Sequence, residues 1–126
     1  MSGFRTARSR IAGRGSAREG AGHFIAQRAT AVALFFLAPW LAISAALSID
    51  SYDDAITFLR MPWNAIGAAL LMIAAGAHMR IGMQVVIEDY IHKTGTRTAL
   101  LLLNSFFAIA LVAVGLFAIL QINFGW

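Results

Sequence analysis

The chain has 126 residues, of which 60% are apolar and 13% charged, with ten Lys and Arg against six Asp and Glu. Soluble domains usually carry about 25% charged residues, and small ones leave much of their surface in water, so this composition excludes an ordinary soluble enzyme. The chain contains no cysteine, which excludes disulfides, thiolate metal sites and cysteine nucleophiles. Its charges separate apolar blocks, which is typical of a membrane protein and gives no reason to expect nucleic acid as a partner.

The N-terminal segment is rich in Arg, Gly, Ala and Ser and contains one acid, Glu19. We predict a basic, flexible arm over residues 1–21 and a single membrane-embedded unit over residues 22–126. A mitochondrial transit peptide has the same Arg-rich and acid-poor composition and is the alternative for the arm.

Three apolar blocks follow, and each is long enough to cross a hydrocarbon core, which takes about 20 residues. The predicted spans are residues 29–49, 62–87 and 98–122, and the second helix should continue to about Tyr90, beyond what the bilayer needs. Pro39 lies near the middle of the first span and should kink it, whereas Pro62 suits the first turn of the second helix. The fold class is therefore an all-α integral membrane protein with three transmembrane helices.

Basic residues predict the orientation of these spans. Most of the Arg residues precede the first span, and Lys93 and Arg97 follow the second. The loop between the first and second spans has Arg60 as its one base, beside three Asp. Because bases flank membrane helices on the inner side, the N-terminus should lie inside and the C-terminus outside.

His78 is the most unusual residue, because a titratable side chain at bilayer depth is costly and usually faces a partner, a cavity or a cofactor. It lies roughly 15 Å along the helix from the predicted inner end. On a helical wheel it shares a line with small residues, among them Gly67, Ala74 and Gly82, and these would leave a shallow slot for a flat macrocycle. Three roles are open for His78: a hydrogen bond to a neighbouring helix, an axial ligand to haem iron, or a proton relay.

The inner end of the second helix carries Glu88, Asp89 and Tyr90. This cluster is either an interfacial cap or a site where the Tyr90 hydroxyl donates a hydrogen bond to a quinone carbonyl, beside Asp89 as a source of protons. Arg28 precedes the first span on the same side. It is either a positive-inside anchor or a fixed positive charge for haem carboxylates or a quinone oxygen.

The sequence also predicts positions for three further polar residues. Arg80 points away from His78 and either extends toward the interface or pairs with an acidic group of a partner or cofactor. His23 and His92 fall outside bilayer depth in these helices and should lie at the surface.

The stretch from His78 to His92 resembles the second span of the hydrophobic membrane anchors of succinate dehydrogenase. The family pattern is a His, a Gly four residues later, a Gln-Val pair and then an Asp-Tyr pair. Here these positions are His78, Gly82, Gln84-Val85 and Asp89-Tyr90. Arg28-Ala29-Thr30-Ala31, where the first span begins, is a second match.

The resemblance implies a membrane anchor of succinate:quinone oxidoreductase, respiratory complex II, that performs no succinate chemistry itself. It would share a haem b with a second three-helix anchor and hold the flavoprotein and iron–sulfur subunits on the inner face of the bilayer. His78 would be an axial ligand to the haem iron, and Arg28 would lie near the haem propionates or the quinone. Tyr90 would hydrogen-bond ubiquinone, with Asp89 as its acidic neighbour.

The expected location is a bacterial inner membrane, with the mitochondrial inner membrane as the alternative. Two other functions are left open. One is a small membrane transport or assembly subunit without haem, and the other is the anchor of a fumarate reductase. The chain differs from some relatives at Arg80, so the resemblance implies no role for that residue.

Overall fold

The structure is a computed structural model in which the backbone of residues 16–125 and the side chains of residues 20–125 are described. Within this range the chain forms four helices and no strand: α2 (Ser16–Ser48), α3 (Tyr52–Arg60), α4 (Pro62–Tyr90) and α5 (Thr94–Phe124). Residues 1–15 of the predicted arm lie outside the described residues. The remainder of the arm, from Ser16, is already part of α2.

Three helices are long and apolar enough to cross a membrane, namely Gly20–Ser48, Pro62–Tyr90 and Thr94–Phe124. The predicted fold class, all-α with three spans, is confirmed. The helix expected to run from Pro62 to about Tyr90 has those bounds. The other two are longer than predicted, since helical backbone satisfies its own hydrogen bonds and therefore continues past the apolar block into the interface.

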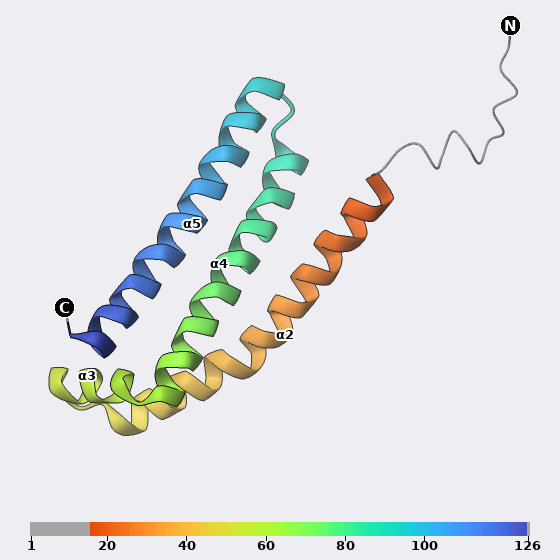
Figure 1. Cartoon of the computed structure of the whole chain (residues 1–126). Helices are drawn as coiled ribbons and strands as arrows, with labels where there is room; N and C mark the ends of the chain where they lie inside the picture. Colours follow the sequence, from red (N-terminus) through yellow and green to blue (C-terminus); the bar gives the residue numbers. More distant parts are fainter. Residues whose placement is uncertain (1–15, 126) are drawn as a thin grey trace, which may run out of the picture.

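Helix α4 is the central helix of the described chain. It packs against α2 on one side and against α5 on the other, while α3 lies across the ends of the long helices and contacts all three (Figure 1). The bundle therefore has an α3 end and, opposite it, a turn end where Ile91, His92 and Lys93 connect α4 to α5.

Helix α2 remains continuous through Pro39. Figure 1 shows the ribbon curving toward the α3 end beyond the middle of the helix. Proline lacks an N–H and its ring crowds the carbonyl one turn earlier, so it bends a helix that neighbouring helices hold in place. The bend agrees with the kink predicted at this residue.

Helix α3 departs from the sequence expectation, which has a charged loop between the first and second spans. The helix begins with a reciprocal cap: Asp54 N–H donates to Ser51 Oγ at 3.2 Å, and Ser51 Oγ donates to the Asp54 carboxylate at 2.8 Å. Such a cap satisfies backbone donors that a short helix leaves free. Phe58 of α3 is buried and holds the helix on the bundle.

Polar side chains connect α3 to its neighbours. Asn64 Nδ2 donates to the Phe58 carbonyl at 3.0 Å, and Asn123 Nδ2 donates to the Leu59 carbonyl at 3.1 Å. Arg60 Nε donates at 3.1 Å to the carbonyl of Ile122, in the last turn of α5. Because the last carbonyls of a helix lack intrahelical partners, this contact also caps α5.

Close packing of α4 and α5 depends on two glycines. A Cβ atom at Gly76 would overlap Cγ2 of Val112, and one at Gly115 would overlap the methyl group of Met72. Small residues of this kind allow transmembrane helices to approach closely.

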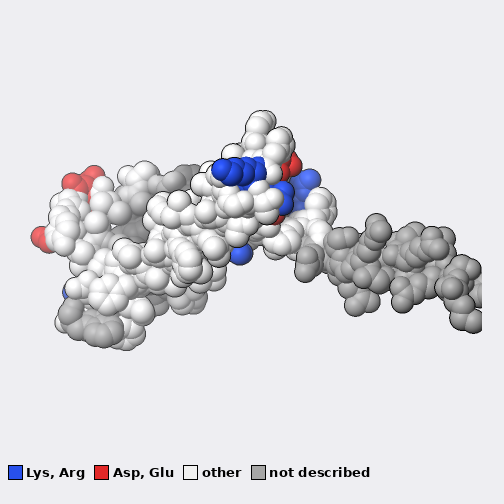
Figure 2. All heavy atoms as spheres, turned by 90° about the horizontal axis from the view of Figure 1, so that it is seen from above, with Lys and Arg blue, Asp and Glu red and all other residues white. Residues whose placement is uncertain are grey.

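The lateral surface of the bundle is apolar. Large side chains such as Phe35 and Phe36 are 72% and 67% exposed, and the buried hydrophobic residues in the described range are Leu41, Phe58, Ala74, Ile81, Ile87 and Ala108. Seen from the turn end, Figure 2 shows charged atoms in separate groups with uncharged surface between them. An apolar surface of this extent requires lipid or another protein against it.

Candidate functional site

His78 lies on α4, half-buried against α2. Its Nδ1 atom is 3.1 Å from the hydroxyl oxygen of Thr30, so the hydrogen bond to a neighbouring helix, one of the roles left open for His78, is present. Among the described residues this is the only hydrogen bond of the imidazole. The Nε2 nitrogen therefore remains available for a ligand.

A hollow opens beside His78 on the α2 side of α4. It has a volume of about 240 Å³ and is lined by Phe24, Gln27, Arg28 and Ala31 of α2 together with His78. Pockets that enclose a drug-sized ligand usually measure about 300–1,000 Å³. The hollow is therefore too small to enclose such a ligand within this chain alone.

Arg28 provides the positive charge of this hollow. Its guanidinium carbon lies 5.1 Å from the centroid of the Phe24 ring, a cation–π contact within one helix. The guanidinium carries donors in a planar fork that suits carboxylate groups. The structure thus brings Arg28 and His78, two of the predicted site residues, to the same cavity.

The predicted slot of small residues is open over only part of its length. A Cβ atom at Gly67 would meet the Trp40 ring of α2, with Cη2 at 2.9 Å, so helix packing fills the slot near the α3 end. At Gly82, one turn beyond His78, a Cβ atom would meet nothing within 4 Å. The exposed part of the slot therefore runs from His78 toward the turn end.

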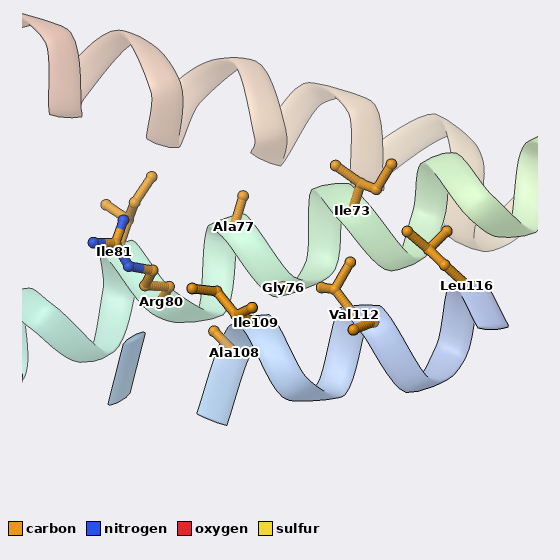
Figure 3. Close-up of a pocket in the computed structure, with 10 residues that line it drawn as sticks. Ile73, Gly76, Ala77, Arg80, Ile81, Ala108, Ile109, Val112 and Leu116 are labelled. Atoms are coloured by element: carbon orange, nitrogen blue, oxygen red, sulfur yellow. The ribbon is translucent and has the colours of Figure 1, made fainter. Parts of the chain in front are cut away.

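Arg80 lies on the other side of α4, as its position on the helical wheel predicted. Its Nε donates to Ser105 Oγ of α5 at 3.1 Å, and Asn104 Nδ2 donates to the Arg80 backbone carbonyl at 2.9 Å. Arg80 also lies at one end of an apolar hollow of about 390 Å³ between α4 and α5 (Figure 3). Its partner in the described chain is a hydroxyl and not a carboxylate, and it does not contribute to the hollow beside His78.

Tyr90 ends α4 and is 78% exposed. It lines a third hollow, of about 510 Å³, whose other residues are mostly apolar side chains of α4 and α5, among them Met83, Val86 and Phe107. Asp89 is exposed and lines neither this hollow nor the one beside His78. At about 100° per residue around the helix, Asp89 lies on the same face of α4 as His78. Tyr90 is turned about 120° away from His78, toward α5.

The remaining histidines match expectation, since His23 and His92 are both exposed. Within the described part of the chain, no three His, Cys, Asp or Glu side chains gather in a way that could hold a metal ion. Sequence reasoning did not single out Thr30, which hydrogen-bonds His78, or Phe24, Gln27 and Ala31, which line the hollow. In the sequence, Thr30 was noted only as part of the match Arg28-Ala29-Thr30-Ala31. That it faces α4 could not be known before the helices were packed.

These features define a class: a polytopic membrane subunit with three spans, an apolar lateral surface and one half-buried imidazole beside a basic residue. The chain belongs to the succinate dehydrogenase/fumarate reductase transmembrane subunit family, which matches residues 3–117. The family predicted from the stretch around His78 is confirmed.

Relatives from bacteria extend this assignment. The succinate dehydrogenase hydrophobic membrane anchor subunit of Paracoccus denitrificans is 32% identical over 95% of this chain and 93% of its own length. The corresponding subunit of Rickettsia bellii is 33% identical over 83% of this chain and 85% of its own length. The corresponding subunit of Rickettsia conorii is 32% identical over 78% of this chain and 79% of its own length. No solved structure matches the chain significantly.

The family and the three spans together identify a multi-pass protein of a bacterial inner membrane, as predicted. A membrane anchor of succinate dehydrogenase is a component of complex II and associates with the other subunits of that complex and with the membrane.

Proposed function

We propose that this chain anchors a succinate:quinone oxidoreductase, provides one axial ligand of a shared haem b, and forms part of the ubiquinone reduction site. The observation that carries the proposal is the hydrogen bonding and the surroundings of the His78 imidazole. Its imidazole has one nitrogen hydrogen-bonded to α2, the other available, and a guanidinium in the same cavity.

The residues around the hollow fit a haem. Neutral imidazole is a common axial ligand of haem iron, and His78 would provide it through Nε2. Arg28 would pair with a propionate, and the Phe24 ring and the open backbone at Gly82 offer apolar, flat surface. When bound, haem b supplies one-electron transfer.

The second axial ligand is proposed to come from a second three-helix anchor of the same complex. His23 is exposed on α2 and lies about 10 Å along that helix from Thr30, the residue beside His78. His92 is exposed at the turn end. Neither lines the hollow beside His78, and the hollow is too small to enclose a haem within this chain alone, so a partner would complete the site.

Tyr90 and Asp89 are proposed for the quinone. The Tyr90 hydroxyl would donate a hydrogen bond to a ubiquinone carbonyl, and the apolar hollow beneath it suits a lipophilic molecule. Asp89 is exposed to water and would pass protons to the reduced quinone. Arg28 is assigned to the haem and not to the quinone, because it lies with His78 on the α2 side of α4, whereas Tyr90 lines the hollow on the α5 side.

We propose that the turn end and the N-terminus face the inside of the cell, where the flavoprotein and iron–sulfur subunits would bind. Lys93 and Arg97 lie at this end, and Asp50, Asp53 and Asp54 lie at the other. This distribution supports the orientation through the positive-inside rule. Tyr90 then lies at the boundary that electrons and protons reach.

The proposal is tested by His78→Ala in the purified complex, with His92→Ala as the matched control. We expect His78→Ala to remove or alter the b-type absorbance in the reduced-minus-oxidised spectrum, and His92→Ala to leave it unchanged. An unchanged spectrum in His78→Ala would show that this residue is not an axial ligand. A colourless wild-type complex without a flavoprotein would instead support a transport or assembly subunit in which His78 only joins two helices. A succinate dehydrogenase anchor and a fumarate reductase anchor would give the same spectrum. They are distinguished by measuring whether the complex oxidises succinate or reduces fumarate faster.

A further inference from the structure

We propose that Thr30 is a positioning residue that sets the tautomer and the ring orientation of His78. This inference rests on the proposed role of His78 as an axial ligand. Thr30 is half-buried on α2, and its hydroxyl oxygen is 3.1 Å from His78 Nδ1. The contact connects the imidazole to a different helix from the one that carries it.

The geometry around Thr30 commits its hydroxyl proton to the backbone of its own helix. The hydroxyl donates to the carbonyl of Ala26 at 2.8 Å and also lies 3.1 Å from the carbonyl of Gln27. Threonine in a helix often donates to the carbonyl one turn earlier in this way. A hydroxyl has one proton and two lone pairs, so Thr30 Oγ1 is left as an acceptor on the side that faces His78.

An acceptor at this position selects one form of the imidazole. In neutral histidine one ring nitrogen carries the proton and the other has a free lone pair. If Nδ1 donates to Thr30, the proton is on Nδ1 and the lone pair is on Nε2. Nε2 is the nitrogen that has no hydrogen bond in the described residues, so it is the one left free to bind a metal.

The contact between Thr30 and His78 would also influence how strongly the imidazole binds the haem iron. Hydrogen-bond acceptors on the far nitrogen of a ligating histidine hold the ring plane and raise the basicity of the ligand. Here the ring is held through Cβ on α4 and through Nδ1 on α2. Threonine suits this role because its β-branched side chain has few rotamers and the bond to Ala26 holds it in one of them.

The experiment uses the assembled complex with Thr30→Val, Thr30→Ser and Thr98→Val. Valine keeps the shape of threonine but removes the acceptor, and serine keeps the hydroxyl. Thr98 is the matched control, because its hydroxyl donates to the Thr94 carbonyl at 3.0 Å on the exposed start of α5, away from His78. The measurements are haem content, the electron paramagnetic resonance spectrum of the oxidised haem and its midpoint potential.

We expect Thr30→Val to weaken haem retention by about 10- to 100-fold, the usual effect of losing such a partner. The midpoint potential should rise, because a less basic imidazole stabilises the oxidised iron less, and the resonance spectrum should shift. Thr30→Ser and Thr98→Val should resemble the wild type. An unchanged potential and spectrum in Thr30→Val would overturn the proposal, as would equal effects of valine and serine, which would indicate packing and not hydrogen bonding.

Two further comparisons keep the result decisive. If Thr30→Val prevents assembly, Thr30→Ala and Thr30→Ser give the same contrast with less bulk, and a haem signal equal in both would overturn the role of the hydroxyl. Failure of the haem-ligand role itself is seen separately, as a b-type spectrum that persists in His78→Ala.

Discussion

Arg28 of α2 and His78 of α4 are distant in the sequence but line the same cavity between the two helices. The guanidinium of Arg28 is held over the ring of Phe24, one turn earlier on its own helix. The two helices therefore place a permanent positive charge beside an imidazole in a surface that is otherwise largely uncharged.

Replacement of Arg28 should weaken haem binding. A hydrogen bond to a charged group contributes about 1.5–3 kcal/mol, so Arg28→Met should lower haem affinity about 10-fold or more. The midpoint potential should also fall, because a positive charge that favours the reduced haem is lost. Arg80→Met removes a guanidinium that bonds Ser105 on the other side of α4 and should leave both quantities unchanged. A larger effect of Arg80→Met than of Arg28→Met would contradict this assignment.

Replacement of Tyr90 should affect the quinone and not the haem. A neutral hydrogen bond contributes about 0.5–1.5 kcal/mol, so Tyr90→Phe should raise the KM for ubiquinone about 2- to 10-fold with an unchanged haem spectrum. The matched control is Tyr52→Phe, because Tyr52 is also 78% exposed but lies on α3 at the opposite end of the bundle. It should leave the KM for ubiquinone unchanged. Unaltered ubiquinone kinetics in Tyr90→Phe would remove its hydroxyl from the site.

Packing of α4 on α5 should be sensitive at Gly76. An added methyl group would overlap Val112, and overpacking of this kind typically costs about 1–3 kcal/mol. We expect Gly76→Ala to lower the midpoint temperature of the complex in detergent. Gly95→Ala, in the exposed first turn of α5 with nothing within 4 Å, should leave it equal or slightly higher. Equal midpoints for both variants would show that the helices can separate at Gly76 without penalty.

The α3 end should lose stability when its polar contacts are removed. Asn123 Nδ2 donates to the Leu59 carbonyl and to the Ile119 carbonyl, and each bond contributes about 0.5–1.5 kcal/mol. Asn123→Ala should therefore lower the midpoint temperature and speed proteolysis within α3, whereas Gln121→Ala, at an exposed position nearby, should do neither. Resistance of α3 to protease in Asn123→Ala would mean that its other contacts, among them buried Phe58 and the bond from Arg60 to the Ile122 carbonyl, are sufficient to hold it in place.

Much of the fold could be predicted because the bilayer imposes a length and a composition on each span. The bounds of α4 follow from Pro62, which starts a helix well, and from the charged residues around Tyr90. Helix α3 was not predicted in the same way. Its apolar residues Ala55, Ile56 and Leu59 do recur at helical spacing, but its nine residues are too few to cross a bilayer, and so short a pattern is hard to distinguish from a charged loop. Its signal was the pair Ser51 and Asp54, which bond each other at the start of the helix.

Arg28 and His78 were candidate residues from the sequence, but that they line one hollow could not be predicted. Periodicity along α4 places Tyr90 on a different side from His78, but it does not say which neighbouring helix covers either side. The pattern of small residues that predicted the slot could not reveal that Trp40 fills it at Gly67, because that contact depends on how α2 crosses α4. For the same reason, periodicity could not show that Arg28 lines the same hollow as His78 until its helix was placed.

By itself, the sequence determined that the chain crosses a membrane three times and carries an imidazole at depth, since apolar length, charge position and residue type are local properties. Only the tertiary structure decided that Thr30 and Arg28, and not residues of α5, lie beside His78. Helical spacing relates residues on one helix, whereas contacts between helices depend on side-chain shapes across the interface, such as those of Gly76 and Val112.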